Sequence, residues 1–175
     1  MSEQQSNQHS DQQSNQHSDQ QSDTQGTDPW AGLDSPAAPN ASSWVAQQLE
    51  AIDRAGTTDA AEIKGRPVEV LTMRGARSGR VLRVPLMRVE HDGVYAAVAS
   101  KGGAPDNPQW YHNVVADPHL LLQDGTTTSK VIAREIHGAE RDEWWPRCVA
   151  AFPDYADYQK NTDRLIPVFL LEPPA

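Results

Sequence analysis

Short apolar segments separated by turn residues constrain the fold of this 175-residue chain more than any other feature. Apolar runs at 81–89 and 94–99 predict two strands, and His91-Asp92-Gly93 between them predicts a hairpin turn. Further strands are predicted around 68–71, 120–123, 126–136 and 165–171, and helices over 43–56, 108–116, 139–151 and 155–161. Strands and helices do not alternate regularly, so we expect a mainly β, α+β fold: an antiparallel barrel with packed helices.

The first forty residues differ in composition from the rest of the chain. They are rich in Gln, Ser, Asn and Asp, and the eight residues 4–11 are repeated as 12–19. Such a segment buries too little apolar area to offset its ordering entropy, so a disordered tail over 1–40 and a folded domain over 41–175 are predicted. The tail has six acidic residues and no Lys or Arg, so it carries −6 of the formal net charge of −9.

The chain shows no sign of secretion, membrane insertion or metal binding. Nothing before residue 40 combines a basic start with an apolar run, and no stretch approaches the ~20 apolar residues of a membrane span. A cytoplasmic location is therefore expected. The one cysteine, Cys148, excludes an internal disulfide and reads as a buried structural thiol. His112, Asp117 and His119 lack a third His or Cys, so no metal site is predicted.

Two segments predict an anion-binding site. Arg74, Arg77, Arg80 and Arg83 lie within ten residues that contain no acid, against the charge of the whole chain. Nucleic acid would need a broader basic face, so a compact anionic ligand is favoured. Downstream, the run 100–113 joins a Lys-Gly-Gly loop to a helix that begins near a proline, which suits a bound phosphate or carboxylate. An ordinary surface turn is the alternative for that loop.

Together and in this order, these segments resemble the deazaflavin-dependent nitroreductases and quinone reductases, split-barrel proteins of the flavin and deazaflavin oxidoreductase superfamily that use reduced coenzyme F(420). The resemblance covers roughly residues 44–173. The matching motifs are Leu71-Thr72, 74–79, Pro85-Leu86, 98–104, Asn107-Pro108, 110–113, 116–118, Trp145-Pro146, 152–155, 157–159 and 162–167. The resemblance implies an antiparallel split barrel like those that bind FMN.

The resemblance also implies which residues bind the coenzyme. The expected phosphate contacts are Arg77, Ser78 and Lys101, and the expected contacts of the polyglutamate tail are Arg74 and Arg80. The residues expected to line the deazaflavin ring are Pro85, Leu86, Ala99, Gly102 and Gly103, with further contacts from Trp110 and Asn113. Arginine suits this task because its planar fork pairs with phosphate or carboxylate through two hydrogen bonds. No Gly-rich dinucleotide motif follows a strand, so a Rossmann site is not expected.

Three further residues match the acceptor pocket of the family. Tyr155 and Tyr158 match its substrate-pocket tyrosines, and Ser100 is the expected hydrogen-bond partner of the acceptor. A tyrosine hydroxyl can donate to developing negative charge without ionising.

The chain departs from the family pattern at two places. Phe152 replaces a tyrosine, which removes one donor and weakens the case for nitro reduction. Leu82 occupies the position of a family arginine, and Arg83 one residue later should point to the opposite face of its strand, so Arg83 is left out of the site.

We therefore expect an oxidoreductase that moves a hydride from reduced coenzyme F(420) to an electron-poor small molecule such as a quinone, a nitroaromatic or an activated alkene. A non-catalytic coenzyme- or lipid-binding barrel and an FMN-dependent split-barrel reductase are the alternatives. A nucleic-acid partner is not expected. A quinone acceptor would bring peripheral contact with the inner face of the plasma membrane. The sequence specifies neither the acceptor nor the oligomeric state.

Overall fold

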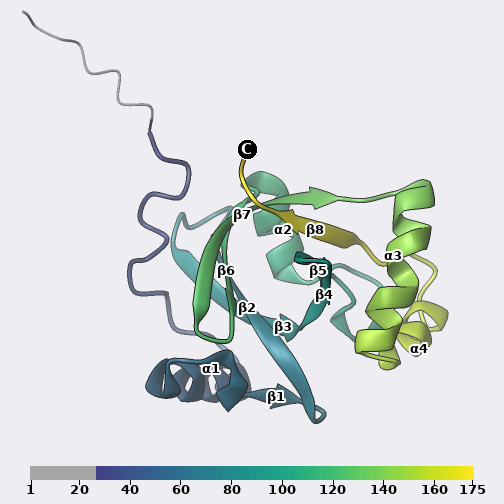
Figure 1. Ribbon diagram of the computed structural model, residues 1–175, viewed down its shortest axis with the longest axis horizontal. Helices are drawn as coiled ribbons and strands as arrows, with labels where there is room; N and C mark the ends of the chain where they lie inside the picture. The colour runs from purple at the N-terminus through teal and green to yellow at the C-terminus, as the bar shows by residue number, and fades with distance from the viewer. Residues whose placement is uncertain (1–26) are drawn as a thin grey trace, which may run out of the picture.

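The computed structural model of the protein describes residues 27–175, which form one curled antiparallel sheet with helices packed around it (Figure 1). The strands are β1 (Glu62–Ile63), β2 (Arg66–Arg74), β3 (Val81–Met87), β4 (Val89–His91), β5 (Val94–Val98), β6 (His119–Asp124), β7 (Thr127–Glu135) and β8 (Val168–Glu172). The helices are α1 (Ser43–Ala55), α2 (Gln109–Ala116), α3 (Gly138–Ala151) and α4 (Asp154–Lys160), with 3₁₀ turns η1 (Thr58–Ala60) and η2 (Lys101–Gly103).

The order of the strands explains why the sheet curls. β3 pairs with β2, and the sheet continues through β6, β7, β8 and β5 to β4, with every pair antiparallel. The two outermost strands, β3 and β4, follow each other in the chain and are separated only by Arg88. Because one residue connects the two edges, the sheet must bend round into an open barrel. The α+β antiparallel prediction is confirmed, except that the strand expected over 81–89 is divided at Arg88.

Local signals in the sequence define most element ends. Ser42 caps α1, with its Oγ accepting a hydrogen bond from the Val45 amide, and Gly56 ends it in the left-handed conformation at φ 73°. The hairpin between β4 and β5 turns at Asp92 and Gly93, whose φ angles are 51° and 81°. These are the turn geometries that such residues favour.

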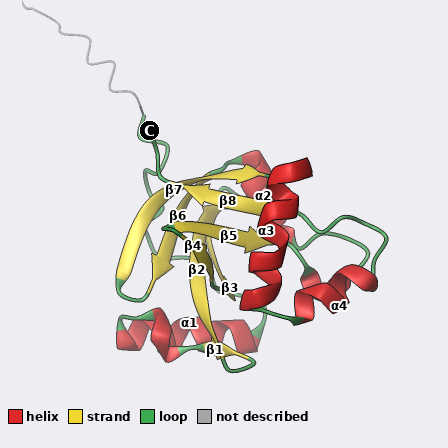
Figure 2. Cartoon of the chain, turned by 45° about the vertical axis from the view of Figure 1, so that its right-hand side comes forward, coloured by secondary structure: helices red, strands yellow, loops and turns green. Residues whose placement is uncertain are grey.

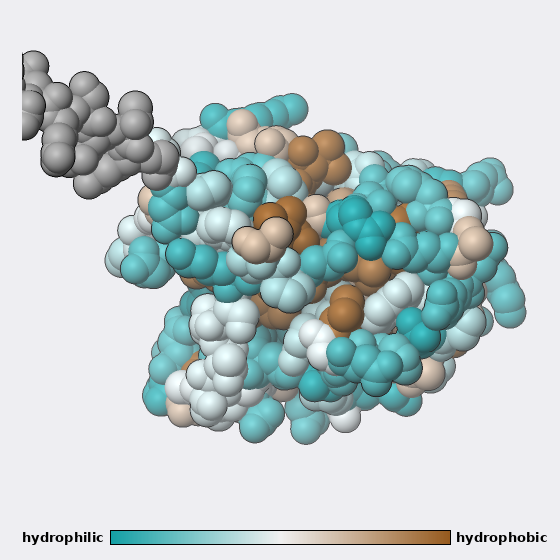
Figure 3. Space-filling view, turned by 45° about the horizontal axis from the view of Figure 1, so that its top comes forward, coloured by the Kyte–Doolittle hydropathy of each residue, from teal (hydrophilic) through white to brown (hydrophobic). Residues whose placement is uncertain are grey.

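Apolar clusters inside and outside the barrel hold the helices and the barrel together. Inside the barrel, Leu71, Leu120 and Phe169 pack with neighbours from the surrounding strands. Outside it, α3 and α4 cover β5 and β8 through a second cluster that includes Trp144 and the fully buried Cys148 (Figure 2). The burial predicted for Cys148 is confirmed. Figure 3 shows one face of the molecule, where apolar side chains gather in hollows between polar ones.

Residues 27–40, named here the N-terminal arm, lie against the barrel instead of forming part of a disordered tail. The Trp30 indole donates to the carbonyl oxygens of Leu120 and Val131 at 3.1 and 3.2 Å, and Leu33 is only 2% exposed. The domain boundary predicted at residue 40 therefore lies too far along the chain, because residues 27–40 already pack against the barrel. Two large apolar side chains outweigh the polar composition of their surroundings. Residues 1–26 of the predicted tail lie outside the described part.

Within residues 27–175, none of the helices combines the length and apolar character that crossing a bilayer requires.

Candidate active site

A pocket of about 350 Å³ lies between the end of the barrel, α1, α2 and α4, and is named here the aromatic pocket. It contains eight of the predicted site residues: Pro85, Leu86, Ser100, Lys101, Gly102, Trp110, Tyr155 and Tyr158. Seven further residues, which were not among the predicted catalytic and coenzyme-binding residues, complete its lining: Trp44, Ile63, Lys64, Met87, Val98, Pro108 and Phe152. Residues from five separate segments of the chain thus converge on one hollow.

Two rings from α4 and that of Phe152, the residue that ends α3, form one wall of the aromatic pocket. Phe152 and Tyr155 meet edge to face with centroids 5.0 Å apart, and Tyr158 lies 6.3 Å from Tyr155. Tyr155 is 4% exposed. Burial, reinforced by the nearby Cys148 and Glu69, raises the pKa of the Tyr155 hydroxyl well above its ordinary value. The hydroxyl therefore stays protonated and available as a donor.

The two glycines of η2 have different tasks. Gly102 lines the aromatic pocket at φ 64°, and a Cβ there would meet no atom within 4 Å. Gly103 is buried at φ 82°, and a Cβ there would lie 2.7 Å from the carbonyl oxygen of Tyr158. Gly103 therefore lets the loop touch the backbone of α4. It was expected to line the deazaflavin ring, but it does not line the pocket.

This difference predicts unequal costs for two matched substitutions. Gly102→Ala should lose about 1 kcal/mol of unfolding free energy from its left-handed backbone. Gly103→Ala should lose roughly 2–5 kcal/mol, because the same strain is joined by a clash with α4. Chemical denaturation of both variants measures the difference. Equal losses would show that the loop does not press on α4.

Arg164 holds the loop that carries Ser100 and Lys101, a role the sequence did not reveal. Its guanidinium donates to the carbonyl oxygens of Ala99, Ser100 and Ala104 at 3.1, 2.8 and 2.8 Å. It also donates to Oδ1 of Asn107 at 2.8 Å. Ala99, expected to line the ring, is itself fully buried and contributes this carbonyl instead. Arg164 stood in a matched motif, but its distance from residue 100 in the sequence concealed the contact.

A second hollow of about 470 Å³, the cationic pocket, lies along the arginine-rich turn. It is lined by Arg74, Gly75, Ala76, Arg77, Ser78, Gly79, Ala116 and Asp117. Arg77 and Ser78 are exposed there, while the Ser78 Oγ accepts a hydrogen bond from the Arg80 amide at 3.1 Å. The turn therefore presents the predicted phosphate-binding side chains to solvent.

Helix α2 connects the two pockets. Trp110 in its first turn lines the aromatic pocket, and Ala116 at its last position lines the cationic pocket, about 9 Å further along the axis. Asn113 between them is 4% exposed, and its Oδ1 accepts from the Ala76 amide at 3.0 Å. Asn113 therefore holds the arginine-rich turn against α2, and it lines neither pocket.

Arg74, Arg83 and Lys101 have partners inside the protein, whereas the Arg80 side chain is exposed. Arg74 donates to the Ala31 carbonyl oxygen of the N-terminal arm at 2.6 Å, and Lys101 pairs with Asp106 at 3.1 Å. Arg83 pairs with Asp53 at 2.9 Å and lines a separate cavity of about 690 Å³ beneath the arm. Arg83 lines neither the aromatic pocket nor the cationic pocket, because the alternation of β3 turns its side chain to the outer face.

His119, which was not predicted to bind a metal, has a local partner. Nδ1 of His119 lies 2.8 Å from the Asp117 carboxylate, and its ring meets Trp30 edge to face. No group of three potential metal ligands occurs among the residues from 27 onward.

Comparison with known proteins places this geometry in context. A family model described as F(420)H(2)-dependent quinone reductase matches residues 44–173. A Mycobacterium tuberculosis relative named F(420)H(2)-dependent quinone reductase is 32% identical over 113 residues, which cover 62% of this chain and 76% of the relative. A second relative from that organism, named for the same activity, is 36% identical over 107 residues, covering 61% of this chain and 90% of its own length.

Two solved structures are similar to this chain. One, described as an F420-H2 dependent reductase, is 54% identical with a TM-score of 0.58, and the match covers 61% of this chain and 95% of that one. Another, described as a domain-swapped dimer, is 52% identical with a TM-score of 0.61, covering 74% of this chain and 97% of that one.

Proposed function

The chain belongs to the F(420)H(2)-dependent quinone reductase family and is an oxidoreductase that uses reduced coenzyme F(420), and we propose that it reduces a quinone held in the aromatic pocket. The observation that carries this proposal is the buried, protonated Tyr155 hydroxyl in a pocket shared with Ser100. A reduction of this kind consumes one hydride and one proton for each quinone. The protein must therefore bind, orient and supply hydrogen-bond donors.

The two hollows suit the chemical character of the coenzyme. An apolar slot with an open glycine at Gly102 accommodates a flat ring, and the exposed Arg77 and Ser78 accommodate a phosphodiester. Lys101, which lines the aromatic pocket, is the third phosphate contact in this proposal. When bound, the reduced deazaflavin supplies the hydride. Arg74 and Arg80 are assigned to the glutamate tail, with Arg74 restrained by the N-terminal arm.

The acceptor half of the pocket is assigned to Tyr155, Tyr158 and Ser100. In our proposal the Tyr155 hydroxyl donates a hydrogen bond to the quinone oxygen on which negative charge develops, and Ser100 and Tyr158 orient the ring. Phe152 offers an apolar face and no donor to this half. We therefore propose quinones as better acceptors than nitroaromatics, whose two oxygens benefit from more donors.

A screen of acceptors tests the proposal directly. The reduced deazaflavin is mixed with protein and a quinone, a nitroaromatic or an activated alkene, and its oxidation is followed by absorbance. Quinones should be turned over fastest, and a parallel titration should show tighter binding of the deazaflavin than of FMN. Tighter FMN binding, or binding of coenzyme without turnover of any acceptor, would refute the assignment.

Replacing Tyr155 with phenylalanine should lower turnover about 10²-fold, because a donor to developing charge is lost while the ring remains. Affinity for the coenzyme should stay within about twofold, since the hydroxyl is assigned to the acceptor. The matched control is Tyr111→Phe, whose hydroxyl faces Glu135 outside both pockets. Wild-type turnover in Tyr155→Phe would remove this residue from the reaction.

We further propose that the protein acts in the cytoplasm and meets a membrane-held quinone at the inner face of the plasma membrane. Cell fractionation tests this location: the protein should be found in the cytoplasmic fraction, and less of it should remain with the membrane fraction when the membranes are depleted of quinone. Recovery only from an extracellular fraction would exclude it.

A further inference from the structure

The turn between β1 and β2 holds a lysine at the rim of the aromatic pocket. Lys64 adopts a left-handed φ of 50° and is followed by Gly65 at φ 72°, a tight turn that directs the chain back into β2. Its Nζ lies 5.5 Å from the ring centroid of Phe152 and 6.0 Å from that of Tyr158. The side chain is 60% exposed, whereas Tyr155 deeper in the pocket is 4% exposed. Lys64 therefore faces whatever part of an acceptor projects toward solvent.

The charged side chains that line the aromatic pocket are all positive. Of the described residues that line the aromatic pocket, two are charged, and both are lysines, Lys64 and Lys101. Lys101 belongs to the coenzyme loop and is paired with Asp106. Lys64 is thus the cation on the acceptor side, beside the rings of α4.

The present partner of Lys64 lies just outside the pocket lining. Nζ contacts Oδ2 of Asp154, the first residue of α4, at 2.5 Å, and both side chains are substantially exposed. An exposed ion pair of this kind contributes only about 0–1 kcal/mol. Contact with the faces of aromatic rings contributes a similar amount, about 0.5–1 kcal/mol. The ammonium can therefore leave Asp154 for a ligand anion at little cost and still remain over the rings.

We propose that Lys64, restrained by Asp154, is a specificity-determining residue that favours acceptors carrying an acidic substituent, a carboxylate or sulfonate, on or beside the reducible ring. The proposal rests on the assignment of the aromatic pocket as the acceptor site. An acid at the solvent-facing edge of the acceptor pairs with Lys64, while the ring lies deeper against Phe152 and Tyr155. Asp154 competes with that acid for the same ammonium, so it sets the strength of the preference.

Paired acceptors test the preference by turnover. The ratio of kcat/KM for 1,4-naphthoquinone-2-sulfonate to that for 1,4-naphthoquinone is measured in each variant, so that differences in acceptor chemistry cancel. Lys64→Met should lower the ratio about two- to fivefold, and Asp154→Asn should raise it by a similar factor. In the double variant Asp154→Asn should have no further effect. Lys160→Met, on α4 but outside the pocket lining, is the control and should leave the ratio unchanged.

Binding without coenzyme separates this proposal from the proposed function. Calorimetric titration with naphthalene-2-sulfonate and with neutral 2-naphthol should give the same ordering of variants, and high salt should shrink the differences. Sulfonate binding that depends on Lys64 in a protein that reduces no quinone would uphold the charge selection and refute the quinone assignment. Unchanged ratios and unchanged sulfonate affinity in Lys64→Met would overturn the inference, as would the same increase from Asp154→Asn in the absence of Lys64.

Discussion

Replacing Arg164 with alanine is expected to weaken coenzyme binding at least about tenfold and to lower the free energy of unfolding by roughly 2–4 kcal/mol. The four acceptors of its guanidinium all belong to the segment from Ala99 to Asn107. Without it, three carbonyl groups and an amide lose a charged donor, and the loop bearing Ser100 and Lys101 must be ordered by the ligand. That ordering entropy then subtracts from the binding free energy.

Two further variants isolate this effect. Arg164→Lys keeps the charge, but a compact ammonium cannot reach all four acceptors at once, so most of the loss should remain. Arg54→Ala removes an arginine from an exposed ion pair with Glu50 on α1 and should cost less than about 1 kcal/mol. Fluorescence titration with coenzyme and thermal unfolding measure both quantities. Full coenzyme affinity in Arg164→Ala would show that the loop is rigid without its clamp.

The second large effect is expected from pH, through a carboxyl group inside the barrel. Glu69 is 0% exposed, and neither of its carboxylate oxygens has a hydrogen-bond partner among the described residues. Burial, and then repulsion from Asp124, raise the pKa of Glu69 well above its ordinary value of 4.5. Arg88, which is already engaged by Asp124, and the nearby Val89 backbone amide, which does not meet hydrogen-bond geometry, act in the opposite direction without compensating for them.

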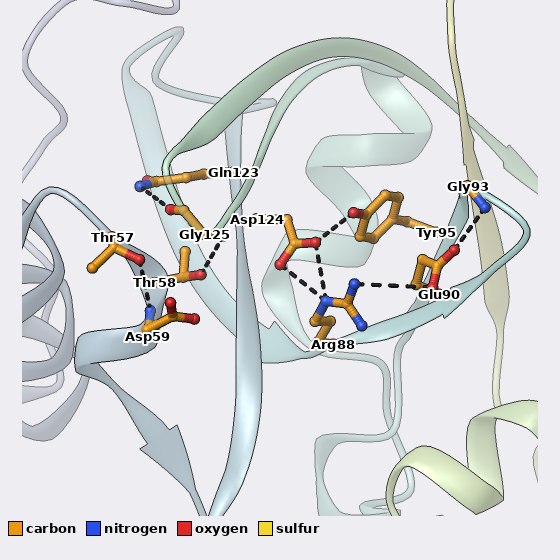
Figure 4. A network of polar contacts seen from close by, with 10 residues as sticks. All are labelled: Thr57, Thr58, Asp59, Arg88, Glu90, Gly93, Tyr95, Gln123, Asp124 and Gly125. Atoms are coloured by element: carbon orange, nitrogen blue, oxygen red, sulfur yellow. Dashed lines mark hydrogen bonds and ion pairs between the residues drawn. The ribbon is translucent and has the colours of Figure 1, made fainter.

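The neighbouring network shows why Arg88 is occupied. Its Nε donates to both oxygens of the Asp124 carboxylate at 2.9 and 3.0 Å, and the Tyr95 hydroxyl donates to the same group (Figure 4). Burial alone would raise the pKa of Asp124, but these hydrogen bonds outweigh it and lower the value. Arg88 therefore stabilises Asp124 as an anion, while the pKa of the nearby Glu69 stays raised.

The sign of the pH effect follows from this raised pKa. The folded protein keeps a proton on Glu69 that the unfolded chain releases above pH 4.5, so this group contributes stability at acidic pH that is lost as pH rises toward its folded pKa. The slope approaches about 1.4 kcal/mol per pH unit in that window. Asp124, with its lowered pKa, contributes the opposite dependence, which is lost as pH falls. Because the two contributions have opposite signs, a variant of Glu69 is needed to separate its effect on stability from that of Asp124.

Glu69→Gln should therefore abolish the loss of stability with rising pH, even if an unpaired amide costs about 1–3 kcal/mol at every pH. Denaturation of wild type and variant between pH 5 and pH 8 gives the two slopes. Glu62→Gln, an exposed glutamate on β1, should keep the wild-type slope. Parallel curves for wild type and Glu69→Gln would mean that Glu69 is already ionised in the folded protein.

The amino-acid sequence alone determined the elements and much of the site. Periodicity, capping residues and turn dipeptides act over a few neighbours, so the ends of α1 and the β4–β5 hairpin could be predicted from them. The motifs likewise identified eight residues that meet in the aromatic pocket. Strand alternation predicted that Arg83 would point away from this pocket, and in the structure its side chain pairs with Asp53.

Only the tertiary structure decided which residues touch the ligand and which hold those that do. Gly103, Ala99 and Asn113 match binding motifs, but packing against α4, Arg164 and the arginine-rich turn gives them supporting positions. The composition of residues 27–40 predicts disorder, but the Trp30 indole donates to two carbonyl groups that lie ninety or more residues away in the sequence. Lys64 carries no motif, and its place beside Phe152 and Tyr158 depends on closing a barrel. Such contacts join segments that are distant in the sequence, and local sequence patterns do not predict which distant segments meet.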